Sequence, residues 1–104
     1  MTRQEFEAII AEINNTECFS LYDVEDECEL FNAAKPKKVA DNLDLDTHRW
    51  YTCCTQVYKI GEWFLGLNGA SDLKSEEMSW KDAYVRTAAF EMEAVPSVTY
   101  KPKG

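Results

Sequence analysis

Only one histidine occurs in the chain, and no phosphate-binding or nucleophile motif accompanies it. The sequence lacks GxGxxG, P-loop and GxSxG patterns, which are common signatures of nucleotide binding and serine hydrolysis. A Cys–His nucleophile pair would need a cysteine within hydrogen-bond reach of His48. On a shared strand, Cys53 would lie on the opposite side from that histidine. We therefore predict no catalytic residue, and we expect that the protein is not an enzyme.

Metal-binding patterns are missing as well. The chain has four cysteines, Cys18, Cys28, Cys53 and Cys54. Their spacing lacks the C-x2–4-C knuckle of structural zinc sites, so we interpret them as packing residues and as free thiols in a reducing cytosol. The aspartates between Asp41 and Asp46 resemble part of a calcium loop, but the glycine and distal glutamate of an EF-hand are absent. We expect neither a metal nor a cofactor.

Long apolar runs are absent, and the N-terminal segment is too charged for a signal peptide, so we expect a cytosolic protein without a membrane span. Basic residues are also in short supply, with 11 Lys and Arg against 19 Asp and Glu, which gives a formal charge of −8. This charge argues against nucleic acid or an anionic membrane as a direct ligand. It favours a basic protein as the partner.

The 104 residues are enough for one domain, which we place over residues 1–104, and an apolar fraction of 45% is typical of a globular chain. Thr2 and Glu5 have the spacing of a capping box at the start of a helix. Apolar residues then recur at helical spacing, at Phe6, Ile9, Ile10 and Ile13. This pattern predicts an amphipathic helix that ends near Asn14 and Asn15.

Residues 50–73 predict a β-hairpin around Gly61-Glu62, a two-residue turn of type II′ with glycine first. If Ile60 pairs with Trp63, one face carries the apolar set Trp50, Cys54, Tyr58, Ile60, Trp63, Leu65, Leu67 and Leu73. The other face is mostly polar, with Tyr51, Val57 and Phe64 as apolar exceptions. Gly66 and Gly69 indicate a bulge or the close approach of another backbone.

The remaining segments have weaker patterns. We expect a short strand over 18–22, a second helix over 24–33 capped by Asp23, and a loop or short edge strand after Lys38. Residues 75–84 favour a helical turn, and alternation over 88–100 predicts one strand that is bulged or at an edge where Pro96 occurs. The sum is an α+β domain, with one or two helices packed on an antiparallel sheet of three to four strands.

The acidic clusters are the sequence feature that best indicates a candidate binding site. Five carboxylates fall within seven residues at Asp23, Glu25, Asp26, Glu27 and Glu29. A second set, Glu76, Glu77 and Asp82, lies beside Trp80 and Tyr84 in the sequence. Charge runs are most often solvated surface, and aromatic pairs at this spacing are most often core. If the clusters are functional, their carboxylates would take the place of nucleic-acid phosphates in the Lys- and Arg-lined groove of another protein. Trp80 and Tyr84 would then be aromatic anchors.

The segments RWYTCCTQVYKI, SEEMSWKDAY and AFEMEAVPSVTYKP together resemble small acidic proteins encoded by phages and prophages of gut and related Gram-positive bacteria. The resemblance covers residues 49–102 and brings no catalytic motif. Size, acidity and α+β build are also similar in type to many anti-CRISPR proteins, several of which mimic nucleic acid. The resemblance implies an inhibitor in the host bacterial cytoplasm that binds a basic nucleic-acid-handling protein, with CRISPR effectors as one class of target.

The alternative is a small virion assembly or accessory protein that oligomerises through its sheet, for instance as a homodimer. It would use the strand edge at Pro96 and the apolar side chains of Tyr51, Val57 and Phe64. The acids would then serve only for solubility. Salt separates the two hypotheses, because it weakens charge-based binding and leaves apolar association intact.

Overall fold

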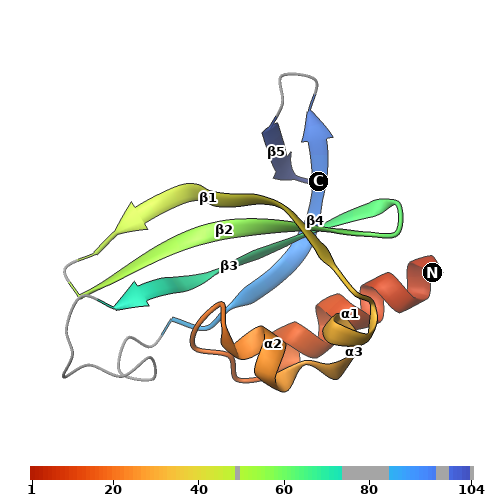
Figure 1. Ribbon diagram of the computed structural model, residues 1–104, viewed down its shortest axis with the longest axis horizontal. Helices are drawn as coiled ribbons and strands as arrows, with labels where there is room; N and C mark the ends of the chain where they lie inside the picture. Colours follow the sequence, from red (N-terminus) through yellow and green to blue (C-terminus); the bar gives the residue numbers. More distant parts are fainter. Residues whose placement is uncertain (49, 74–84, 96–98, 104) are drawn as a thin grey trace.

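The computed structural model in Figure 1 describes residues 1–48, 50–73, 85–95 and 99–103. The helices of this part of the chain are α1 (Arg3–Asn15), α2 (Asp23–Glu27) and α3 (Glu29–Ala33). The strands are β1 (Lys37–Thr47), β2 (Tyr51–Ile60), β3 (Trp63–Leu73), β4 (Ala88–Val95) and β5 (Thr99–Pro102). The strands form one antiparallel sheet in sequence order, and Figure 1 shows the helices gathered on one side of it. The predicted α+β architecture is confirmed, with the short β5 added beyond the four long strands.

The β2–β3 hairpin has the register that its turn predicts. Ile60 pairs with Trp63, and the pairing runs without interruption to Cys53 and Ala70. Gly61 has a φ of 61° and Glu62 is not among the residues with positive φ, as a type II′ turn requires. A bulge between Thr52 and Cys53 then shifts the register, so that Leu73 pairs with Tyr51. The prediction that Trp50 faces the core is therefore wrong, and this side chain is 47% exposed.

Helix α1 begins and ends where its sequence predicts. The Glu5 N–H donates to Thr2 Oγ1 at 3.1 Å, and the Thr2 N–H donates to Glu5 Oε1 at 2.9 Å, which completes the capping box. The apolar stripe of the helix lies on the sheet, where Phe6 is fully buried and stacks on Trp63 with ring centroids 5.4 Å apart. The main core between helices and sheet consists of Phe6, Ile9, Ile13, Cys18, Leu21, Val24, Cys28, Phe31, Cys54, Tyr58, Ile60, Leu65, Leu67 and Ala89.

The sheet face turned away from the helices is also packed. Phe90 and Met92 of β4 converge over Gly66, where an added Cβ would lie 2.7 Å from each side chain. Phe64 and Tyr100 make a further ring contact, with centroids 5.2 Å apart. Val57, on this face, is fully buried. Val57 is therefore not free to contact a partner, contrary to its predicted part in sheet-mediated oligomerisation.

Strand β1 is a long edge strand with an irregular backbone. Its pairing with β2 is interrupted by register shifts between Lys38 and Ala40, between Ala40 and Leu43, and between Leu43 and Asp46. Asn42 and Asp44 have φ values of 54° and 50°, which Asn and Asp tolerate better than most residues. Bulges and charges of this kind protect an edge from pairing with another strand. The segment is thus an edge strand, one of the two predicted alternatives, but it is 11 residues long where the sequence predicts a short strand.

Several other local predictions need correction. Residues 18–22 form a loop, in which the Leu21 N–H donates to the Ala70 carbonyl and the Cys18 carbonyl accepts from the Thr87 N–H, but these bonds form no strand ladder. The second predicted helix is divided at Cys28, whose φ of −110° and ψ of 95° are extended. In place of the one strand predicted over 88–100, the structure has two, β4 and β5, which pair antiparallel. The predicted helical turn over 75–84 and the strand irregularity at Pro96 lie outside the described residues.

Candidate acidic interface on helices α2 and α3

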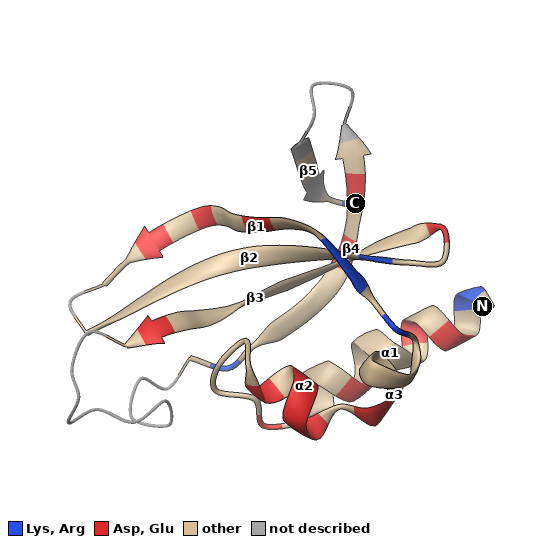
Figure 2. Ribbon diagram, in the orientation of Figure 1, with Lys and Arg blue, Asp and Glu red and all other residues tan. Residues whose placement is uncertain are grey.

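The first acidic cluster projects from the helical side of the molecule. Glu25, Asp26, Glu27 and Glu29 are all exposed, and Figure 2 shows acidic residues gathered along α2 and the start of α3. The same segment buries Val24, Cys28 and Phe31 almost completely. Because these apolar side chains fix the inward face of both short helices, the intervening carboxylates are directed outward. We refer to the four exposed acids as the acidic ridge.

Two nearby carboxylates have structural partners. Asp23 does not cap α2 as predicted, since the N-cap residue is Tyr22 and it makes no side-chain capping bond. Instead, Asp23 Oδ2 accepts a hydrogen bond from the Phe19 N–H at 2.9 Å, which holds the loop that leads into α2. Glu12 Oε1 of α1 accepts from the Leu30 N–H at 3.0 Å and so satisfies a donor at the start of α3. Asp23 is therefore the least available of the five predicted acids.

Within the described residues, no ion pair involves the acidic ridge. The ion pairs found there join Arg3 to Glu7 and Glu91, Lys38 to Asp41, and Lys103 to Glu91, and His48 Nε2 lies 3.1 Å from Asp46 Oδ2. Four like charges on two adjoining short helices repel each other, and the repulsion is stronger at low salt. A basic partner would relieve this repulsion, because it supplies the counter-charges that the described part of the chain does not place here.

The second predicted cluster, Glu76, Glu77 and Asp82 with Trp80 and Tyr84, lies outside the described residues. Further acids occur on β1, and Figure 2 shows these acids away from α2 and α3. Of these, Asp41 is engaged locally. Desolvation raises its pKa, but hydrogen bonds from the Asn42 N–H and from Lys38 outweigh that effect and lower it overall. The acidic ridge is thus the one predicted cluster whose positions the structure defines.

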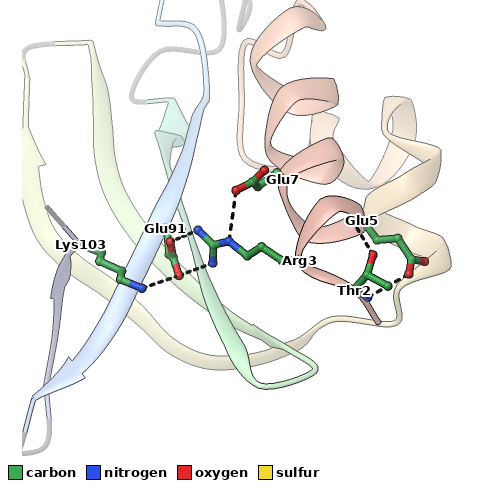
Figure 3. A network of polar contacts seen from close by, with 6 residues as sticks. All are labelled: Thr2, Arg3, Glu5, Glu7, Glu91 and Lys103. Carbon is green, nitrogen blue, oxygen red and sulfur yellow. Dashed lines mark hydrogen bonds and ion pairs between the residues drawn. The ribbon is translucent and has the colours of Figure 1, made fainter.

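Arg3 joins the start of α1 to the sheet through an ion pair with β4, and sequence reasoning missed this contact. Figure 3 shows its guanidinium on Glu91 of β4, with Nη1 donating to Oε2 at 2.7 Å and Nη2 donating to Oε1. Lys103 Nζ reaches the same carboxylate at 3.4 Å. The Arg3 hydrogen bonds lower the pKa of Glu91. The two residues are 88 positions apart, so no local pattern signals the pair.

The four thiols are buried, and the histidine packs on an aromatic ring. Cys18 and Cys28 are fully buried with their Sγ atoms 4.0 Å apart, and burial raises the pKa of Cys18 to about 12. Burial raises the pKa of Cys53 as well, so these thiols stay protonated. His48 stacks on Tyr51, with ring centroids 4.5 Å apart. In the described ranges, no three His, Cys, Asp or Glu side chains are grouped so that they would hold a metal ion.

No protein-family model matches this chain, and comparisons with curated proteins and with solved structures find no match either. None of the described helices is both long enough and apolar enough to span a membrane.

Proposed function

We propose that this protein is a non-enzymatic, phage-type inhibitor that binds a basic nucleic-acid-handling protein of a bacterial host through the acidic ridge. The ridge would occupy the Lys- and Arg-lined surface on which that protein holds nucleic-acid phosphates. This proposal includes anti-CRISPR activity as one form. It places the complex in the host cytoplasm.

The observation that carries the proposal is the group of four exposed carboxylates without an ion-pair partner among the described residues. Glu25, Asp26, Glu27 and Glu29 are held outward by buried neighbours, whereas Asp23 and Glu12 are used within the fold. A net charge of −8 gives the whole molecule a field of the same sign, which would speed association with a basic surface. Such a field would also repel free nucleic acid.

The test is affinity capture of the tagged protein from a bacterial host lysate, with washes at low and then at high salt. We expect a nucleic-acid-binding protein to be retained at low salt and released by high salt or by added DNA or RNA. The variant Glu25→Gln/Asp26→Asn/Glu27→Gln/Glu29→Gln should lose the captured protein. Retention by that variant would refute the proposal.

A matched variant controls for total charge. Neutralising Asp44, Asp46, Glu62 and Asp72 removes the same number of exposed carboxylates from the strands and the β2–β3 turn. If both variants lose the partner equally, binding depends on net charge and the acidic ridge is not the site. If only further copies of the protein are captured and salt does not release them, the assembly role takes the place of the inhibitor role.

A further inference from the structure

An apolar groove lies between α1 and α3, next to the acidic ridge. Its lining residues are Met1, Glu5, Ala8, Ile9, Leu30, Ala33 and Ala34. Met1 and Leu30 are 52% and 46% exposed, although both are large and apolar. Three of the lining residues are alanines, Ala8 on α1 and Ala33 and Ala34 at the end of α3, and their small side chains leave space between the two helices. Contiguous exposed apolar surface with a polar border is typical of protein–protein contact sites.

Carboxylates border this groove. Glu5 is one of its lining residues, and Glu29 precedes Leu30 on α3. Glu12 also approaches Leu30, since its Oε1 accepts from the Leu30 N–H at 3.0 Å. A side chain that enters the groove would thus lie close to the Glu5 carboxylate and to the end of the acidic ridge at Glu29. Lys35 follows Ala34 and is the nearest basic residue along the chain at the far end of α3.

We propose that the groove receives one large apolar side chain, such as Leu, Met or Phe, from a basic segment of the partner protein. The Lys or Arg residues beside that side chain would pair with Glu5 and with the acidic ridge, whose member nearest the groove in sequence is Glu29. This inference rests on the proposed function and adds the chemistry of the recognised segment. Charge would bring the partner to the surface, and burial of the apolar side chain would fix where it binds.

The inference is tested with synthetic helical peptides in which Lys alternates with Leu at helical spacing, and with matched Lys/Ala and Glu/Leu peptides. We expect the Lys/Leu peptide to shift the backbone amide NMR signals of Ala8, Leu30 and Ala33. We also expect it to bind about ten- to a hundredfold more tightly than the Lys/Ala peptide, the factor that burial of a Leu-sized side chain supports. Equal binding of the Lys/Leu and Lys/Ala peptides, or shifts confined to other elements, would overturn the inference.

Two uncharged substitutions and a matched control complete the test. Leu30→Ser removes a wall of the groove, and Leu45→Ser makes the same change at another exposed leucine, which lies on β1. We expect Leu30→Ser to weaken binding of the Lys/Leu peptide at least about tenfold and Leu45→Ser to leave it unchanged. Ala8→Gln fills the groove at an exposed helical position and should weaken binding in the same way, even if Leu30→Ser fails to fold.

The same variants distinguish this inference from the proposed function. In the lysate capture, loss of the partner with the neutralised acidic ridge but not with Leu30→Ser or Ala8→Gln would overturn the groove inference alone. Retention of the partner by the ridge variant and by both groove variants would overturn both. Loss of the partner both with the ridge variant and with the groove variants supports the two together.

Discussion

Gly69 of β3 marks the point where the loop that precedes α2 crosses the sheet, and Gly69→Ala tests whether this crossing is tightly packed. An added Cβ would lie 2.6 Å from Thr87 Oγ1 and 3.3 Å from Leu21 Cδ2. Both neighbours are almost fully buried, with 3% and 4% exposure. Thr87 Oγ1 also donates to the Ser20 carbonyl at 3.0 Å. The new methyl group must therefore displace Thr87 and strain a buried hydrogen bond.

The expected cost follows from three contributions. Overpacking costs about 1–3 kcal/mol, and a weakened buried hydrogen bond costs about 1 kcal/mol more. Restricting the unfolded chain by replacing glycine with alanine offsets about 0.4–1 kcal/mol of this. We expect a net loss of about 2 kcal/mol in the free energy of unfolding, or a fall in Tm of roughly 10 °C for a chain of this size. Urea unfolding and calorimetry measure the two quantities.

A double-mutant cycle with Thr87→Ala shows whether the clash is with Thr87. Removing Oγ1 relieves the closest contact, so Gly69→Ala/Thr87→Ala should be less destabilised than the sum of the single variants by at least about 0.5 kcal/mol. Gly66→Ala is the control, because its added Cβ meets Phe90 and Met92 on the other face. That substitution should combine additively with Thr87→Ala. Additive behaviour of Gly69→Ala with Thr87→Ala would refute the packing argument.

Three further predictions concern the ion pair, the core and the thiols. Because hydrogen bonds from Arg3 lower the pKa of Glu91, its carboxylate adds stability above the unfolded-state value of 4.5, and that stability is lost as the pH falls through the lower folded-state pKa. The free energy of unfolding of Glu91→Gln, measured with denaturant, should therefore fall less than that of the parent protein when the pH is lowered below 4.5. Equal losses in the two proteins would contradict this link between the Glu91 pKa and stability. Phe6→Ala removes a fully buried ring and should lower the free energy of unfolding by about 3–5 kcal/mol, as measured by urea unfolding, whereas a change below about 1 kcal/mol would show that the core is packed differently. Cys18 and Cys28 should react slowly with iodoacetamide in the folded protein and rapidly in denaturant, as followed by mass spectrometry, and rapid labelling of the folded protein would show that these thiols are accessible.

The elements that the sequence predicts best are those whose determinants lie within a few residues of one another. The capping box of α1 joins residues three positions apart, and the β2–β3 turn depends on one glycine between two apolar runs. Helix α1 has the predicted bounds, and the hairpin has the predicted register from its turn as far as Cys53, where the bulge shifts it. At Gly69 the close approach is made by the side chains of Thr87 and Leu21, whereas the sequence predicts a bulge or the approach of another backbone.

Other features depend on contacts between distant parts of the chain. The break at Cys28 places Val24 and Phe31 in the core together, and the bulges of β1 follow from its pairing with β2. The helix-like pattern over 24–33 does not signal the break at Cys28. The alternation of leucine with acidic residues after Lys38 does not signal the bulges of β1. The same limit applies to the groove between α1 and α3, because exposed Leu30 has no distinguishing mark in the sequence.

For the candidate site, the sequence by itself determined which residues carry charge and that their sum is strongly negative. Tertiary structure decided which of those charges are free to act. Asp23 and Glu12 bond to backbone N–H groups, whereas Glu25, Asp26, Glu27 and Glu29 project outward from two short helices. The physical reason is that charge is a property of each side chain, whereas exposure and pairing depend on which apolar neighbours become buried and on which backbone donors the folded chain brings within reach.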